Sequence, residues 1–305
     1  MARGVRLLAL GIVVLAAACS GTGATEETTT TTTSTPATTT TVDADPLVAF
    51  VGEERPSRLV IPPAWEADGE PLPLVVLLHG YTATGELQDL YLGVSSTGSD
   101  LGYLTLTPDG TTDERGNQFW NATDFEQFVD DAGYLEGLID EVIAGYNADP
   151  DRVYLVGHSN GGFMANKLAC DIPDRIAGIA AIAGGVFGTG SDCLAPTRVL
   201  FIQGTDDGTV PFEGGVFLGG RVLGAQDTVD LWRGAGECTD ASATKGPFDY
   251  DLLVPGEETT ITVWEDCAPS ASVELWSMEG SGHIPGFLPA FRSAMMERLL
   301  GIEDN

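Results

Sequence analysis

One serine of the chain lies between glycines, in the stretch GHSNG at 157–161. The apolar run 152–156 precedes it, and a stretch of small residues with helical character follows. A serine hydroxyl is a poor nucleophile at neutral pH and needs a base within hydrogen-bond distance. The flanking glycines permit the sharp strand-to-helix turn, with positive φ at the serine, that exposes such a hydroxyl. The pattern therefore predicts a nucleophile at Ser159.

A base for this serine must be one of the chain's three histidines, His79, His158 and His283. Taken alone, a histidine is more often a buried hydrogen-bonding residue than a catalyst. His79 ends a strand, and His158 is next to the serine itself. His283 follows a predicted final strand, within the glycine-rich segment GSGHIPG, from which it could reach the serine. We therefore expect His283 to be the base.

A carboxylate that orients this base is expected after another strand, where two aspartates stand side by side, Asp206 and Asp207. Position relative to the strand does not choose between them. Because the serine, the aspartates and His283 all follow strands, parallel strands would bring the three groups to one edge of a sheet.

The elements that must position these groups alternate along the chain. Apolar runs predict strands, and apolar residues at helical spacing predict helices between them. Continuous apolar strands between helices indicate a mostly parallel, twisted sheet covered on both faces, with every strand ending at the same edge. The predicted strands are 74–80, 103–110, 152–157, 176–185, 197–204, 261–267 and 273–280, and the helices are 133–147, 161–170, 226–236 and 289–300.

The order serine, aspartate, histidine along the chain is the order found in the α/β-hydrolase fold. In that fold the helix after the serine directs its free N–H groups toward the developing negative charge. The N–H of Asn160 is therefore expected to be one oxyanion donor. The second is expected from the loop after the first strand, at the N–H of Tyr81.

Further motifs resemble the esterases grouped with poly(3-hydroxybutyrate) depolymerases and with feruloyl and acetylxylan esterases. The similarity extends over residues 72–300, and a hydrolase pattern Gly-Thr-x-Asp-x-x-Val-Pro within it favours Asp207, with Asp206 a solvent-facing turn residue. One departure is Gln203, where the family often has histidine. The motifs are LLHGY, TPDG with GNQFWNATD, VDDAGYLEGLIDEV, DPDRVYLVGHSNGG, QGTDDGTVP and EGSGH.

The resemblance implies hydrolysis of carboxylic esters through an acyl-serine, with no cofactor. Substrates could be small aryl esters, feruloylated or acetylated polysaccharide, or polyester. It also suggests Trp120 as a pocket residue, the alternative being a packed core aromatic. Three other functions remain open: an acyltransferase with the same three residues, a peptidase, and a non-catalytic surface binding module.

Besides Cys19 the chain has four cysteines, an even number typical of disulfides in an exported protein. Each is expected at the sheet edge opposite the serine, because it ends a helix or precedes a strand. This placement predicts the pairs Cys170–Cys193 and Cys238–Cys267. A zinc site is not expected, since no C-x-x-C occurs.

The beginning of the chain predicts export. Residues 1–18 resemble a signal peptide, with arginines before an apolar run too short to span a membrane comfortably. The small residues before Cys19 resemble a bacterial lipobox and predict a lipid anchor to the membrane, the alternative being ordinary secretion. Residues 19–45, rich in threonine, are expected to be a disordered linker. The catalytic domain is expected at 46–305.

The chain is strongly acidic, with a formal net charge of −31. Such a charge repels phosphate backbones, so nucleic acid is not expected as a partner. It is consistent with high solubility.

Overall fold

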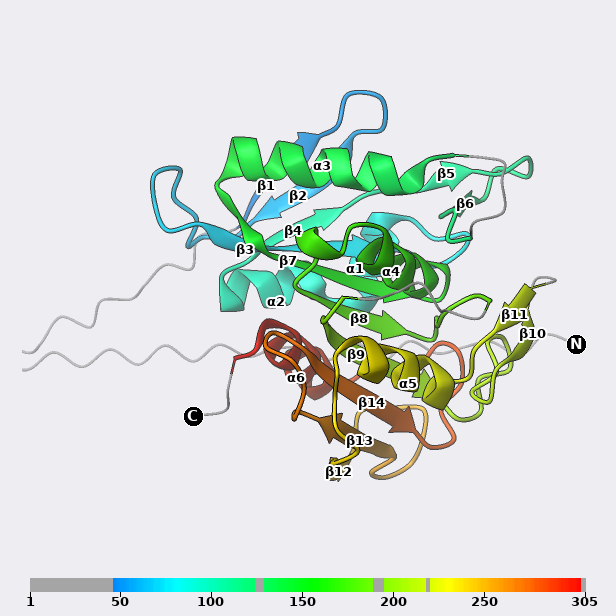
Figure 1. Cartoon of the computed structure of the whole chain (residues 1–305). Helices are drawn as coiled ribbons and strands as arrows, with labels where there is room; N and C mark the ends of the chain where they lie inside the picture. Colours follow the sequence, from blue (N-terminus) through cyan, green and yellow to red (C-terminus); the bar gives the residue numbers. More distant parts are fainter. Residues whose placement is uncertain (1–45, 124–128, 189–194, 218–219, 303–305) are drawn as a thin grey trace, which may run out of the picture. The chain divides into compact units, whose positions relative to one another are not determined.

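A ten-stranded sheet with helices on both faces organises the part of the chain that the computed structural model describes, residues 46–123, 129–188, 195–217 and 220–302 (Figure 1). The strand order is β1-β2-β4-β3-β7-β8-β9-β14-β13-β12. This arrangement confirms the predicted α/β class. The predicted signal peptide and linker, 1–18 and 19–45, lie outside the described residues.

The centre of the sheet consists of parallel strands, whose apolar sequences are buried on both faces. Their carboxyl ends meet at one edge, on the right in Figure 1. In sheet order they are β4 (Leu104–Thr107), β3 (Leu72–Leu78), β7 (Ala148–His158), β8 (Gly178–Ile182), β9 (Arg198–Gly204) and β14 (Ser272–Met278).

Antiparallel strands extend the sheet on both sides. These are β1 (Leu47–Val51) and β2 (Ser57–Ile61) beyond β4, and β13 (Thr259–Trp264) and β12 (Ala243–Phe248) beyond β14. The expectation that every strand ends at the same edge is therefore wrong for β13. The short connection 265–271 between β13 and β14 allows only an antiparallel pair, because a parallel crossover needs a dozen or more residues.

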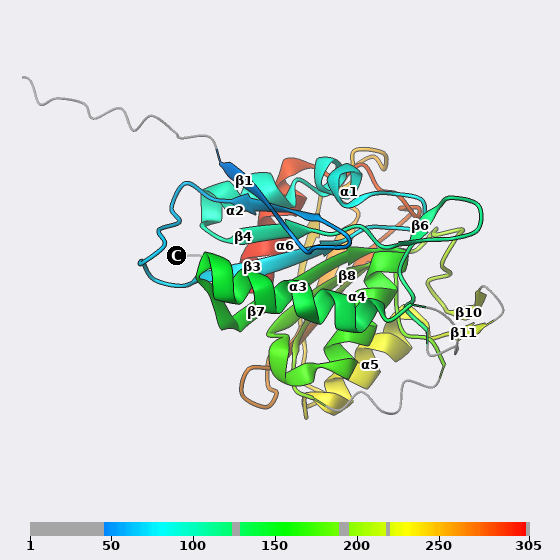
Figure 2. The same ribbon diagram turned by 90° about the horizontal axis from the view of Figure 1, so that it is seen from above.

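The helices cover the two faces in two groups (Figure 2). Alternate residues of each central strand point to opposite faces: Val76 and Leu155 pack in one core, and Val75 and Val156 in the other. One group comprises α3 (Asp131–Tyr146), α4 (Asn160–Asp171) and α5 (Ala225–Ala235), and the other α1 (Gly85–Leu92), α2 (Val94–Leu101) and α6 (Pro289–Leu300).

Small elements lie outside the large sheet. A 3₁₀ turn follows α4, and two short hairpins follow β4 and β9. Their bounds are η1 (Pro173–Arg175), β5 (Thr111–Thr112) with β6 (Gln118–Phe119), and β10 (Gly215–Phe217) with β11 (Gly220–Val222). The sequence predicts the central strands, β13 and the helices α3 to α6. It does not predict these small elements, β1, β2, β12, α1 or α2.

A disulfide joins Cys238 and Cys267, as predicted. Cys238 follows the end of α5, and Cys267 lies in the connection after β13, whose reversed direction brings its end to the edge opposite Ser159. The other predicted pair includes Cys193, which lies outside the described residues, so the Cys170–Cys193 pairing stays a prediction.

Removing this disulfide should destabilise the domain without changing its active-site geometry. The disulfide joins two cysteines that are 29 positions apart in the sequence, and closing a loop of that size lowers the entropy of the unfolded chain. We expect the double variant C238S/C267S to lose about 3.5 kcal/mol of unfolding free energy. Urea denaturation of both proteins measures this difference. Equal stability of variant and parent would show that the cross-link is dispensable.

In the described residues no helix combines the length and the apolar character that a membrane crossing requires. The same residues contain no group of three or more His, Cys, Asp or Glu side chains placed to hold a metal ion.

Candidate active site

Ser159 stands at the turn between β7 and α4, at the carboxyl edge of the sheet. Its backbone has φ 54° and ψ −117°, which confirms the positive φ predicted for this serine. Two main-chain hydrogen bonds hold the strained residue: its N–H donates to Ile182 O at 2.8 Å, and its C=O accepts from Phe163 N–H at 3.0 Å. The neighbouring strand and the first helical turn therefore fix the direction of the side chain.

The glycines on each side of the serine are required by main-chain contacts. A Cβ at Gly161 would lie 2.1 Å from Leu78 O, and a Cβ at Gly157 would lie 2.1 Å from Gly161 O. Neither oxygen belongs to a flexible side chain, so no rotamer change would relieve the overlap. The turn is thus packed directly against the end of β3.

The Gly161→Ala variant should therefore unfold more easily than the parent, and its Ser159 should be displaced. The overlap with Leu78 O should lower the free energy of unfolding by about 1–3 kcal/mol. A matched control is Gly137→Ala on α3, where an added Cβ meets nothing within 4 Å. That helix substitution should raise stability by about 0.5–1 kcal/mol. Thermal denaturation of both variants checks the pair, and a G161A protein as stable as G137A would contradict the packing.

His283 joins the serine to an acid through its two ring nitrogens. Its Nε2 lies 2.9 Å from Ser159 Oγ, and its Nδ1 lies 2.8 Å from Asp207 Oδ2. A carboxylate only accepts hydrogen bonds, so we assign the proton of the neutral ring to Nδ1, which leaves Nε2 to accept from the serine hydroxyl. The side chain of Asp207 is 0% exposed and that of His283 is 15% exposed.

The loop after β9 orients the carboxylate of Asp207 with further hydrogen bonds. Its Oδ1 accepts the N–H groups of Thr209 and Val210, each at 2.8 Å. Gln203 is buried beneath this loop and its Nε2 donates to Val210 O at 2.7 Å. The amide that replaces the family's frequent histidine thus supports the loop of the acid. Asp206, the alternative acid, is exposed.

The N–H groups of Tyr81 and Asn160, predicted as oxyanion donors, have no hydrogen-bond acceptor among the described residues. Asn160 begins α4, where the first N–H groups have no partner within the helix. A Cβ at Gly80, directly before Tyr81, would lie 3.5 Å from Ser159 Cβ. The loop after β3 therefore passes beside the serine.

Trp120 packs in the core, as the alternative interpretation of this residue proposed, and the residue is 1% exposed. Its main chain supports the site: its N–H donates to Asn160 Oδ1 at 2.6 Å, and its C=O accepts from Asn160 Nδ2 at 3.0 Å. These two bonds fix the side chain of Asn160 against the main chain of Trp120. Sequence reasoning missed this pair, because no motif links residues 40 positions apart.

The two other histidines are buried and hydrogen-bonded to main-chain groups. His79 Nε2 accepts from Gly110 N–H at 2.9 Å, so its Nδ1 donates to Gly80 O, at 2.8 Å. Burial lowers the pKa of His79, and it lowers the pKa of His158 to about 4. Both rings are therefore neutral at pH 7.

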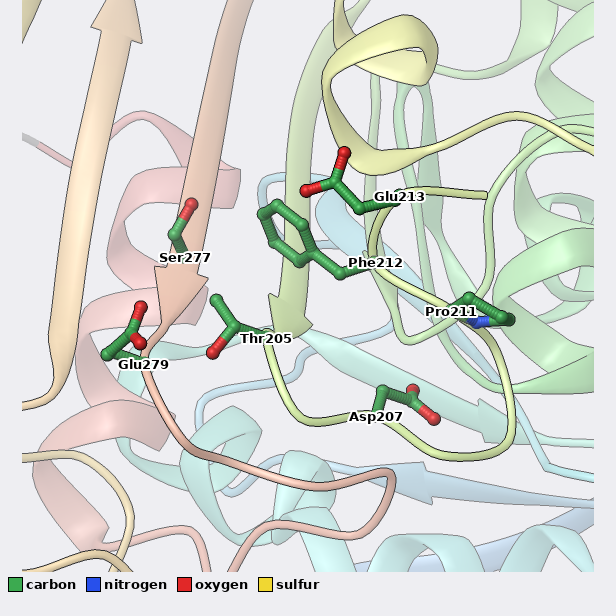
Figure 3. Close-up of a pocket in the computed structure, with 7 residues that line it drawn as sticks. All are labelled: Thr205, Asp207, Pro211, Phe212, Glu213, Ser277 and Glu279. Atoms are coloured by element: carbon green, nitrogen blue, oxygen red, sulfur yellow. The ribbon is translucent and has the colours of Figure 1, made fainter. Parts of the chain in front are cut away.

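A cavity of about 560 Å³ lies beside the acid. Figure 3 shows the side chains that line it. The residues that line it are Thr205, Asp207, Pro211, Phe212, Glu213, Ser277 and Glu279. Of these, only Asp207 takes part in the hydrogen bonds to His283. The three carboxylates make the cavity unfavourable for an anionic ligand.

The sheet order and the Ser159–His283–Asp207 arrangement are those of an α/β-hydrolase. Solved structures share this fold: acetyl xylan esterase from Aspergillus awamori superposes with a TM-score of 0.60 at 14% identity, covering 84% of this chain and 100% of its own. An S-formylglutathione hydrolase from Agrobacterium tumefaciens gives a TM-score of 0.52 at 18% identity, covering 83% of this chain and 92% of its own.

The family model "Esterase PHB depolymerase" matches residues 57–210, half of the chain, and the protein belongs to this esterase family. Poly(3-hydroxyalkanoate) depolymerase C of Paucimonas lemoignei is 28% identical over 228 residues, 69% of this chain and 54% of its own. Feruloyl esterase B of Piromyces equi is 25% identical over 224 residues, 70% of this chain and 40% of its own. The chain thus spans about half the length of these relatives.

Proposed function

We propose that the protein is a serine esterase that hydrolyses carboxylic esters through an acyl-serine intermediate. The observation that carries this proposal is one imidazole, His283, which lies within hydrogen-bond distance of both a strained serine and a buried carboxylate. Membership of an esterase family supports it.

In the acylation step, Ser159 Oγ attacks the ester carbonyl carbon and His283 Nε2 takes the hydroxyl proton. Asp207 stabilises the imidazolium that forms. The N–H groups of Tyr81 and Asn160 donate to the oxyanion of the tetrahedral intermediate. The C–O bond to the alcohol then breaks, and the imidazolium gives its proton to the leaving oxygen.

In the deacylation step, water replaces the alcohol. His283 removes a proton from the water as it attacks the acyl-serine, and the same two N–H groups stabilise the second oxyanion. The imidazolium then protonates Ser159 Oγ, which releases the carboxylic acid. This sequence needs no cofactor.

The substrate class follows from the relatives. They are named for poly(3-hydroxyalkanoate), feruloyl and acetylxylan esters, so we propose polyesters and feruloylated or acetylated polysaccharides as candidates beside small aryl esters. Ile284, which follows the base in the sequence, is 63% exposed, and Tyr81, in the loop after β3, is 48% exposed. Such residues suit an uncharged ester better than a charged one.

A panel of p-nitrophenyl acyl esters, methyl ferulate, acetylated xylan and polyhydroxybutyrate tests the function and narrows the substrate. We expect hydrolysis of short acyl esters by the parent and a loss of at least about 10³-fold in Ser159→Ala. Repeating the reactions with added alcohol separates hydrolysis from acyl transfer. Activity confined to long acyl chains would count against the family assignment of the substrate.

We also propose that the protein is exported and anchored by a lipid on Cys19, after removal of residues 1–18. The arginines, the apolar run and the small residues before Cys19 support this, and the Cys238–Cys267 disulfide suits an oxidising compartment. The linker 19–45 would then hold the catalytic domain, 46–305, away from the membrane. Cys19→Ala should move the protein from the membrane fraction; a membrane fraction unchanged by this substitution would contradict the anchor.

A further inference from the structure

His158 precedes the nucleophile, and the proposed reaction gives its side chain no role. Its ring is buried, with 6% of the residue exposed. Its Nε2 lies 2.9 Å from the main-chain oxygen of His283. A carbonyl oxygen only accepts hydrogen bonds, so Nε2 carries the proton and donates it. The residue before the nucleophile thus binds the main chain of the base directly.

The ring of His158 fills the space between three parts of the site. Its centroid is 5.2 Å from that of the His283 ring and 5.6 Å from that of Tyr91, which it meets edge-on. A Cβ at Gly80 would lie 3.4 Å from His158 Nδ1, so the ring also lies beside the loop that carries Tyr81. A movement of the base toward this space would therefore collide with the imidazole.

A second side chain holds the segment that carries the base. Tyr91, on α1, donates its hydroxyl proton to Pro285 O at 2.7 Å. The segment GSGHIPG, 280–286, contains three glycines and neither helix nor strand, so its own secondary structure does not fix it. His158 and Tyr91 bind carbonyls on either side of Ile284 and so restrain the main chain around His283.

The His158 ring is neutral, which suits its position beside the ring of His283. Burial lowers its pKa to about 4, so it carries no charge beside His283 while that ring becomes an imidazolium. A second positive charge at 5.2 Å between ring centroids would oppose the proton transfer from Ser159.

We infer that His158 is a positioning residue, which keeps His283 within reach of Ser159 through the hydrogen bond to the main chain of the base. The inference rests on the proposed esterase function. A misplacement of about 1 Å in a catalytic group can reduce the rate about 10²-fold. Loss of the His158 bond should therefore lower kcat and leave substrate binding largely unchanged.

The test compares His158→Leu, which removes the donor, with His158→Gln, whose amide N–H can replace Nε2–H. We expect H158L to lower kcat about 10²-fold with KM within about twofold, and H158Q to recover kcat to within about tenfold of the parent. Tyr91→Phe should lower kcat about threefold to tenfold, because the second bond remains.

The matched control for the tyrosine is Tyr103→Phe, since Tyr103 donates a similar hydroxyl bond to Val94 O at 2.7 Å in the buried core. It should lower Tm and leave kcat unchanged. The proton that His283 shares with Asp207 gives a readout independent of turnover: its downfield NMR resonance should be sharp in the parent and exchange-broadened in H158L.

The inference is overturned if H158L keeps a parental kcat and resonance, or if H158Q is no more active than H158L. If H158L does not fold, H158Q decides, and a kcat of H158Q more than about tenfold below that of the parent overturns the inference. A parent that hydrolyses no ester defeats the proposed function instead, and the NMR comparison still reports whether His158 positions His283.

Discussion

Ser159→Ala should lower kcat/KM for ester hydrolysis at least about 10³-fold, and by up to about 10⁶-fold. The alanine removes the oxygen that lies 2.9 Å from His283 Nε2, so no acyl-enzyme can form. The fold should survive, because the two bonds that hold residue 159 come from its main-chain N–H and C=O. Initial rates with p-nitrophenyl acetate and a parallel Tm measurement check both statements.

The matched control is Ser96→Ala on α2, an exposed serine on the face of the sheet covered by α1, α2 and α6. It should leave kcat/KM unchanged. A Ser159→Ala protein that keeps more than about a tenth of the parental kcat/KM, at an equal Tm, would show that the nucleophile lies elsewhere.

Asp207→Asn should lower kcat about 10⁴-fold. An asparagine amide can donate to His283 Nδ1, and the ring would then carry its proton on Nε2, where it can no longer accept from Ser159. The size stays the same, and the amide oxygen can still accept the N–H groups of Thr209 and Val210. Steady-state kinetics over a range of pH separates this effect from a change in substrate binding.

The neighbouring Asp206→Asn is the matched control, because Asp206 is exposed and Asp207 is buried. It removes the same charge one residue away and should leave kcat within about twofold of the parent, since exposed charges interact weakly. Equal losses in the two variants would mean that the charge of the loop matters and the hydrogen bond to His283 does not.

The central strands and the three site residues could be predicted because their signals are local. Continuous apolar runs mark β3, β7 and β9, and the residues after parallel strands must meet at one edge of the sheet. The positive φ of Ser159 follows from the two glycines beside it. A short motif and a topological rule therefore indicated Ser159 and His283, 124 positions apart, while the resemblance to a hydrolase pattern was needed to choose Asp207 over Asp206.

The outer strands carry weaker signals. In β1, Leu47, Val48 and Phe50 are exposed or half-exposed, so the strand lacks the buried alternation that identifies a sheet face. β12 contains a glycine and a proline and is almost entirely exposed. Such strands are held by pairing with a neighbour more than by their own sequence.

The supporting contacts of the site could not be predicted either. Asn160 bonds the main chain of Trp120, and His158 bonds the main chain of His283. Main-chain acceptors exist at every residue, so no residue type signals which one a buried side chain will reach. For Trp120 the sequence left a core position and a pocket position as alternatives, and its neighbours in the structure place it in the core.

Labelling with a fluorophosphonate, followed by mass spectrometry of the digested protein, tests the central claim most directly. The probe phosphonylates an activated serine with loss of fluoride, and the adduct mimics the tetrahedral intermediate. We predict one adduct per chain, on the peptide that contains Ser159, with loss of ester hydrolysis in proportion to labelling. An adduct on another residue, or full hydrolysis by a chain completely labelled at Ser159, would contradict the account.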